Sequence, residues 1–95
     1  MKVGVSRRAL NDLAEIADYI AAEDRGAATR VRKAIEDAID RIARYPYLGM
    51  QNARAADLRS VLVVPYPYRL HYRVRGETVW IVHIRHTARR PWPLR

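Results

Sequence analysis

The sequence contains no cysteine. Disulfide bonds, thiolate metal sites and cysteine nucleophiles are therefore excluded, which fits a reducing compartment. The N-terminus has no apolar stretch of signal-peptide length, and the longest strongly apolar run, residues 61–64, is far too short to span a bilayer. We therefore expect a cytoplasmic protein without a membrane partner, and the sequence suggests neither a metal nor another cofactor.

Lysine is scarce, and the charge is unbalanced. Lys2 and Lys33 are the only lysines among 18 basic residues, which face 10 acidic ones and leave a formal net charge of +8. Arginine binds phosphates and carboxylates through paired hydrogen bonds. A GC-rich genome would also explain the ratio of arginine to lysine, but it would not explain the net charge. The composition therefore predicts an anionic partner, either nucleic acid or an acidic protein segment.

The first half of the chain shows helical periodicity after one short strand. Val3 and Val5 alternate with polar neighbours, and Ser6 is suited to cap a following helix. Apolar residues then recur at spacings of three and four, which predicts two amphipathic helices joined by a turn at residues 24–26. The first apolar stripe consists of Leu10, Leu13, Ala17 and Ile20, with Asp12, Glu15 and Asp18 lying off it; the second consists of Ala28, Val31, Ile35, Ala38, Ile39 and Ile42.

The second half changes to strand periodicity after Tyr45-Pro46 ends the helix and residues 46–57 form a loop. Strands are predicted at residues 58–64, 68–75 and 78–86, with Gly76-Glu77 as a hairpin turn and residues 87–95 as an extended tail. In the middle strand, alternation separates an apolar face from a basic face. The apolar face contains Tyr68, Leu70, Tyr72 and Val74, and the basic face contains Arg69, His71, Arg73 and Arg75.

These elements predict one α+β domain over residues 1–95, in the order β-α-α-β-β-β. An antiparallel sheet would be packed on one face by the helical hairpin. The same alternation places Trp80, Val82 and Ile84 inward on the last strand. The expected core is Leu10, Leu13, Ile20, Val31, Ile35, Ile39, Leu70, Tyr72, Trp80, Val82 and Ile84.

Four motifs in sequence order resemble the ParE/RelE toxin superfamily of type II toxin–antitoxin systems. The first helix carries A-x-x-D-L-x-x-I-x-x-Y-I at residues 9–20, and a P-x-x-G loop follows at residues 46–49. The strands carry L-R at residues 58–59 and Y-R-L-H-Y-R-V at residues 68–74, and the chain closes with V-H-I-R-H-T-A-R-R at residues 82–90. Each motif is weak alone, but four in order at matching spacing are specific for the family.

The resemblance implies a growth-arresting toxin, of the kind that stabilises plasmids, neutralised by a cognate antitoxin encoded beside it. Given the basic toxin, we expect that antitoxin to be acidic. The resemblance also implies one of two targets. ParE-like members inhibit DNA gyrase without catalysis of their own, and RelE-like members cut messenger RNA on the ribosome.

A RelE-like nuclease needs a proton acceptor, a proton donor and positive charge at the phosphate. The candidate catalytic residues are Arg69, His83, His86 and Arg89. The lysines that the family uses on its strands are absent from residues 60–63, and no tyrosine follows the last strand. Together with the acidic first helix, these absences favour the ParE-like function.

A ParE-like toxin would use these residues for binding. We expect the target contact to include Arg85, Arg89, Arg90, Trp92 and Arg95, because Trp and Arg are common interface anchors. A basic sheet face of Arg69, His71 and Arg73 would adjoin it, although such a row is also typical of an ordinary solvated sheet face. A plain nucleic-acid-binding module and an inactive toxin are the remaining alternatives.

Overall fold

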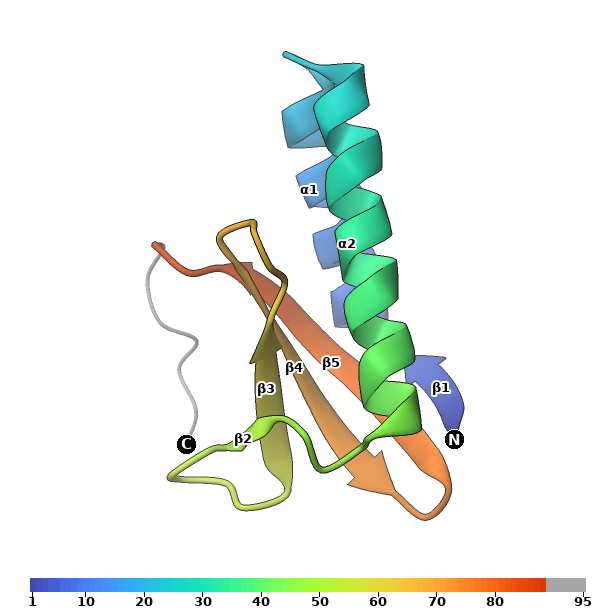
Figure 1. Ribbon diagram of the computed structural model, residues 1–95. Helices are drawn as coiled ribbons and strands as arrows, with labels where there is room; N and C mark the ends of the chain where they lie inside the picture. The colour runs from blue at the N-terminus through green and yellow to red at the C-terminus, as the bar shows by residue number, and fades with distance from the viewer. Residues whose placement is uncertain (89–95) are drawn as a thin grey trace.

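The computed structural model describes residues 1–88. A short strand, β1 (Lys2–Val5), precedes two helices, α1 (Arg7–Ala21) and α2 (Arg25–Arg44). Four strands follow: β2 (Met50–Gln51), β3 (Leu58–Leu62), β4 (Tyr68–Arg75) and β5 (Thr78–His86). Figure 1 shows the two helices as a hairpin beside the sheet, projecting beyond its upper end. The expected α+β fold with a helical hairpin is confirmed.

The five strands form one sheet in the order β1-β5-β4-β3-β2. Three details differ from the sequence prediction, of which the first is that β3 ends at Leu62 and not at residue 64. The expected loop at residues 46–57 contains β2, which pairs antiparallel with β3, and β1 lies parallel to β5 in an otherwise antiparallel sheet. Hydrogen bonds from the amide of Lys2 to the carbonyl of Glu77 and from that of Ser6 to Ile81 extend the β1–β5 ladder. Alternation in a short strand does not encode its partner or its direction, so this pairing was not predictable.

Both helices begin at capping side chains. Ser6 accepts a hydrogen bond from the Ala9 amide at 3.1 Å, and Asp24 accepts one from the Ala27 amide at 3.0 Å. Such caps satisfy amides that have no partner within the helix. Because Asp24 is a cap, α2 starts at Arg25, one residue into the expected turn at residues 24–26. Among residues 1–88, no helix combines the length and apolar character needed to cross a membrane.

The core lies between the hairpin and the sheet. Of the expected core residues, Val31, Ile35, Leu70, Tyr72 and Ile84 are buried, and Leu13, Ile20 and Ile39 pack partly buried against them. The predicted burial of Leu10 is wrong, because 54% of this residue is exposed and its neighbour Ala9 is buried instead. The inward stripe of α1 therefore keeps Leu13 and Ile20, but it contains Ala9 and Ile16 in place of Leu10 and Ala17.

A bulge in β5 overturns the predicted face of that strand. Tyr72 pairs with Ile81 and His71 pairs with His83, so Val82 is an extra residue. An extra residue reverses the alternation beyond it. Before the bulge, Val79 and Ile81 are buried while Trp80 is 43% exposed, and beyond it Ile84 is buried. The predicted inward positions of Trp80 and Val82 are therefore wrong; Val82 is only half-buried.

Candidate functional site

The pairing of β4 with β5 brings four nitrogen-rich side chains together. Arg69 lies opposite Arg85, and His71 lies opposite His83. The two imidazole rings stack with centroids 5.9 Å apart and planes 18° apart. The β5 bulge puts His83 and Arg85 in these positions, because without the extra residue Val82 would face His71. In this register His83 and Arg85 of β5 lie beside Arg69 and His71 of β4.

Asp12 anchors α1 to this part of β5. Its Oδ2 atom lies 2.6 Å from Nδ1 of His83 and accepts a hydrogen bond of 2.9 Å from the amide of Ile84. Both side chains are largely buried, with exposed fractions of 15% for Asp12 and 8% for His83. The sequence pattern placed Asp12 off the apolar stripe and missed this role. The signal was its spacing from Ala9 and Ile16, which puts all three on one helix face.

The contact with Asp12 also determines the tautomer of His83. The Nε atom of Arg8 lies 3.3 Å from the same Nδ1 atom. One ring nitrogen cannot both donate to a carboxylate and accept from a guanidinium. The carboxylate contact is shorter by 0.7 Å, as the two distances show, and it joins a carboxylate to an N–H donor, so we assign the proton to Nδ1. The imidazole then holds a fixed orientation.

The arginines on the open sheet face have partners of their own. Arg69 donates to the hydroxyl of Ser60 at 2.9 Å. Arg73 and Arg75 reach Asp57, from the loop before β3, at 3.5 and 3.0 Å. The basic row of β4 therefore has an acidic neighbour, which a loop residue supplies. These exposed or half-exposed ion pairs contribute little to stability.

His71 is buried in this cluster, with 7% of its surface exposed. Burial, and to a smaller extent the charges of His83, Arg85 and Arg69, lowers the pKa of His71 from 6.5 to about 4. The imidazole is therefore neutral at neutral pH. A neutral, buried histidine is a poor anion ligand, so His71 contributes to packing in the basic face and not to its charge.

We expect the protein to lose stability as the pH falls from 6.5 towards 4. The unfolded chain protonates His71 near pH 6.5 and the folded chain only near pH 4, so protons favour the unfolded state between these values. At about pH 5 this group alone costs about 2 kcal/mol relative to neutral pH. Urea unfolding of the wild type and His71→Gln at both pH values measures it. The variant should lose about 2 kcal/mol less than the wild type; equal losses would contradict the burial argument.

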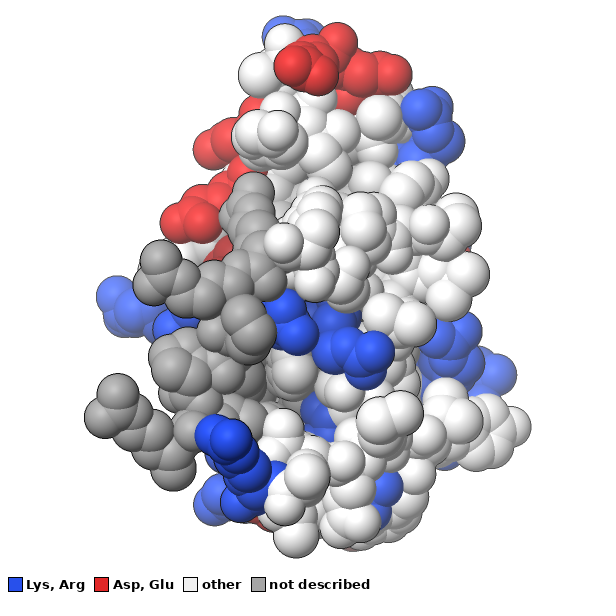
Figure 2. All heavy atoms as spheres, turned by 90° about the vertical axis from the view of Figure 1, so that its left-hand side faces the viewer, with Lys and Arg blue, Asp and Glu red and all other residues white. Residues whose placement is uncertain are grey.

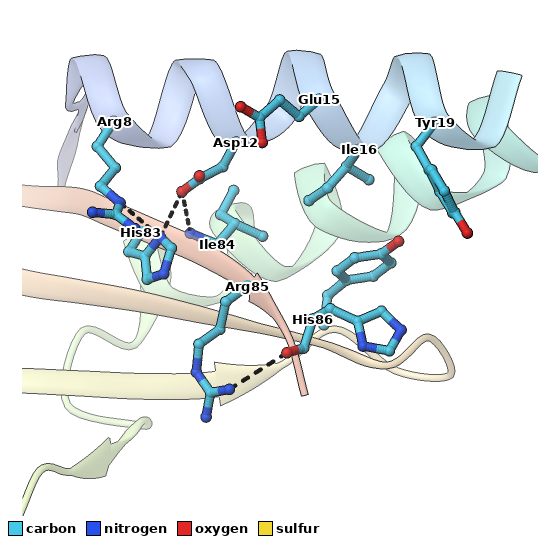
Figure 3. Close-up of a pocket in the computed structure, with 10 residues that line it drawn as sticks. Arg8, Asp12, Glu15, Ile16, Tyr19, His83, Ile84, Arg85 and His86 are labelled. Carbon is cyan, nitrogen blue, oxygen red and sulfur yellow. Dashed lines mark hydrogen bonds and ion pairs between the residues drawn. The ribbon is translucent and has the colours of Figure 1, made fainter. Parts of the chain in front are cut away.

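A cleft of about 480 Å³ opens between α1 and the end of β5. Figure 3 shows Asp12 pointing from the helix to the strand, whereas Arg85 points away from the helix. His86 accepts a hydrogen bond from the Ala88 amide at 3.1 Å and lies edge-on to Tyr68. The cleft is lined by Arg8, Asp12, Glu15, Ile16, Tyr19, Tyr68, His83, Ile84, Arg85 and His86.

The structure brings together only part of the expected site. His83, Arg85 and His86 share the cleft, while Arg69 and Arg73 lie on the open sheet face. Sequence reasoning missed Arg8 and Glu15, which come from α1 and carry no motif of their own. Arg89, Arg90, Trp92 and Arg95 lie outside the described residues. Within residues 1–88, no three His, Cys, Asp or Glu side chains are placed to hold a metal ion.

A second, apolar groove of about 160 Å³ runs between the two helices. Its lining is almost entirely aliphatic, with charged side chains only at its rim. An apolar depression on a helical hairpin suits the apolar face of another helix or extended segment. The groove is lined by Leu13, Ile16, Ala17, Ala28, Val31, Arg32, Ile35, Glu36 and Ile39.

Charge is divided between the two halves of the described chain. Residues 1–40 contain eight acidic and seven basic residues, whereas residues 41–88 contain eight arginines and only two acids. Figure 2 shows acidic side chains gathered where the hairpin projects beyond the sheet and basic ones across the middle and lower part of the molecule. Residues 41–88, which comprise the last turn of α2 and the sheet strands β2 to β5, therefore carry a surplus of six positive charges and attract anionic surfaces.

Comparisons with known proteins agree on one family. Residues 3–91 match the family described as "ParE toxin of type II toxin-antitoxin system, parDE". The chain is 44% identical to "Toxin RelE2" of Caulobacter vibrioides over 82 residues, covering 86% of this chain and 90% of the relative. It is 37% identical to "Putative toxin Y4kP" of Sinorhizobium fredii over 86 residues, covering 90% of this chain and 86% of the relative.

Solved structures share the fold at low sequence identity. The chromosomal ParDE toxin–antitoxin system of P. aeruginosa superposes with a TM-score of 0.67 at 21% identity, covering 90% of this chain and 95% of that chain. The intact E. coli RelBE toxin–antitoxin complex gives a TM-score of 0.65 at 18% identity, covering 94% of this chain and 98% of that chain. At these identities the likeness concerns the fold and does not distinguish between the two targets.

Proposed function

Because the chain belongs to the ParE toxin family of type II toxin–antitoxin systems, we propose that it binds and inhibits DNA gyrase and is neutralised by a cognate acidic antitoxin. The observation that carries the choice of target is how the candidate nuclease groups are held. Arg69 bonds Ser60, and His83 is buried against Asp12. Because these two side chains are engaged in contacts within the protein, they suit a structural role in a binding surface better than a role in catalysis.

The target contact is proposed on the sheet half of the molecule. Arg85 is the described member of the expected target-binding set, and its guanidinium points away from α1 (Figure 3). The proposal extends to Arg89, Arg90, Trp92 and Arg95, which follow β5 in sequence. The surplus of arginine on this half supports an encounter with an acidic surface, since complementary charge speeds association and orients the partners.

The antitoxin contact is proposed at the apolar groove between α1 and α2. Ile16 and Ala17 on one helix and Ala28 on the other leave apolar surface in a depression. An antitoxin segment that becomes ordered on binding would fill such a groove with its own apolar side chains. An acidic residue of that segment would meet Arg32 of α2, the one basic residue among those that line the groove.

A ribosome-dependent nuclease on messenger RNA is the second candidate. One observation favours it: His83, His86 and Arg85 share one cleft with Arg8. A histidine oriented by a carboxylate is a common general base, and one relative is named "Toxin RelE2". Against it, His83 is only 6% exposed, which leaves little of the ring available to a substrate.

We expect the purified toxin to block gyrase supercoiling and to leave ribosome-bound messenger RNA intact. Deleting residues 91–95 should relieve the inhibition at least tenfold, because it removes Trp92 and Arg95. The variant His86→Ala should inhibit as the wild type does, since binding does not require a proton donor. Supercoiling and ribosome-dependent cleavage assays on the three proteins provide the measurement.

The nuclease alternative predicts the opposite pattern. The wild type would cut messenger RNA on the ribosome without affecting supercoiling. His86→Ala would then lose on the order of a hundredfold in cleavage if it supplies the proton. That combination would overturn the gyrase proposal.

A further inference from the structure

One group of exposed apolar side chains lies outside both the cleft and the apolar groove. It occupies residues 45–50, where α2 ends and β2 begins, at the opposite end of α2 from the hairpin tip (Figure 1). Tyr45, Tyr47, Leu48 and Met50 are 59%, 67%, 54% and 71% exposed. Four such side chains within six residues are unusual on a surface with no partner, because they leave apolar area in water.

The backbone beneath these side chains is held rigidly from the core. The buried hydroxyl of Tyr72 donates to the carbonyl of Pro46 at 2.8 Å and accepts from the amide of Gly49 at 2.9 Å. Gly49 fits only without a side chain, since a Cβ there would lie 2.5 Å from that hydroxyl and 2.9 Å from the carbonyl of Ser60. The loop is therefore preformed, and binding through it loses little conformational entropy.

Arginine completes the surface. Arg59 donates to the carbonyls of Tyr47 and Gly49 at 3.3 and 3.0 Å, and its guanidinium lies 5.1 Å from the centre of the Tyr47 ring. Arg44, which precedes Tyr45, and Arg54, four residues after Met50, are also exposed. Tyrosine, methionine and arginine are the residues most enriched at protein interfaces.

We infer that residues 45–50, with Arg59, form a preformed docking platform for an acidic, pocketed surface of the toxin's protein target, which under the function proposed above is gyrase. The flanking arginines select an acidic surface. Side chains that protrude from a fixed backbone need pockets in a partner that is already folded. A segment that folds on binding needs a groove instead, and the hairpin supplies that groove.

A protein partner also fits better than nucleic acid. Leu48 and Met50 have no flat face on which a base could stack, and one face of Tyr47 is already taken by Arg59. Single-strand binding relies on open aromatic faces that track a phosphate backbone. Beside its two tyrosines, the platform offers the aliphatic and thioether surface of Leu48 and Met50, which suits apolar pockets.

The test compares two double variants that remove similar exposed apolar side chains. Leu48→Ala/Met50→Ala alters the platform. Leu10→Ala/Val64→Ala is the matched control, because Leu10 is 54% exposed like Leu48, and Val64 is 69% exposed, close to the 71% of Met50. Affinities for purified gyrase and for the antitoxin, supercoiling inhibition, binding to a labelled single-stranded oligonucleotide, and growth arrest after induction are measured for both and for the wild type.

The platform variant should bind gyrase at least tenfold more weakly and inhibit supercoiling correspondingly less, as expected for the loss of interface anchors. Its antitoxin affinity should stay within about twofold of the wild type, and the control variant should match the wild type throughout. Unchanged gyrase affinity in the platform variant overturns the inference. A selective loss of antitoxin or oligonucleotide binding also overturns it and assigns the loop to that partner.

Failure of the proposed function gives a different pattern. If the wild-type toxin does not inhibit supercoiling, gyrase is not the target. The docking role of the platform is then tested by growth arrest of the platform and control variants. If the platform variant loses growth arrest and the control variant keeps it, with oligonucleotide and antitoxin binding intact in both, the loop contacts another protein target. If both variants arrest growth like the wild type, the platform is wrong.

Discussion

Replacing Ala17 with glutamate should release the toxin from its antitoxin, lowering the affinity on the order of a hundredfold, or about 2.7 kcal/mol. Ala17 lines the apolar groove of about 160 Å³ between α1 and α2. The larger side chain would occupy much of that space and would bring a carboxylate into an apolar contact. An acidic antitoxin would also be repelled by the added negative charge.

The matched control is Ala14→Glu, the same substitution on the same helix at an exposed position that does not line the groove. Both variants add one negative charge, and glutamate suits a helix interior, so both should fold. Affinity is measured by calorimetry, and neutralisation by growth rescue when toxin and antitoxin are produced together. Ala17→Glu should arrest growth despite the antitoxin, whereas Ala14→Glu should be rescued. Equal rescue of the two would place the antitoxin elsewhere.

Replacing Asp12 with alanine should lower the free energy of unfolding by about 3 kcal/mol. Its carboxylate accepts from the Ile84 amide at 2.9 Å and contacts Nδ1 of His83 at 2.6 Å. Hydrogen bonds to a charged group are stronger than neutral ones, and the substitution leaves two buried donors without this acceptor. Glu15→Ala is the control, because Glu15 is an exposed acid one turn later on α1 and should change stability by no more than about 0.5 kcal/mol.

A double-mutant cycle with His83→Ala isolates the pair. Coupling of more than about 1 kcal/mol between Asp12 and His83 is expected in urea unfolding, since the two side chains touch and are largely buried. Additive effects would show that the contact does not stabilise the fold. Under the gyrase proposal, His83→Ala still inhibits supercoiling at temperatures where it is folded, because its role is to join α1 to β5.

Local sequence rules correctly predicted several features of the helices and of one turn in this chain. Ser6 capped the first helix as expected, the apolar spacing of α2 identified Val31 and Ile35 as core, and Gly76 forms the hairpin turn with a φ of 59°. These features depend on neighbours within a few residues, so the sequence records them directly. The family resemblance added the expectation of an antitoxin partner.

The errors arose where distant segments meet. The bulge at Val82 inverted the expected faces of Trp80 and Val82, and the residues next to Val82 do not predict a bulge. Asp12 was taken for a solvated charge because its partners are 71 and 72 residues away. Asp57 contacts Arg73 on the basic face, and it lies in a loop whose position depends on the sheet. Strand register and loop placement are properties of the whole packed chain, so local patterning cannot reveal them.

By itself the sequence determined the composition of the surfaces: a strongly basic chain without thiols, two amphipathic helices, and a strand whose alternate residues are arginine or histidine. It also held the motifs that identify the family. Only the tertiary structure decided which of these groups meet. The bulge in β5 places His83 opposite His71, and α1 places Asp12 against His83. The hydroxyl of Tyr72 holds the exposed loop at residues 45–50. Periodicity fixes what each element can bury, whereas register and packing fix what each side chain touches.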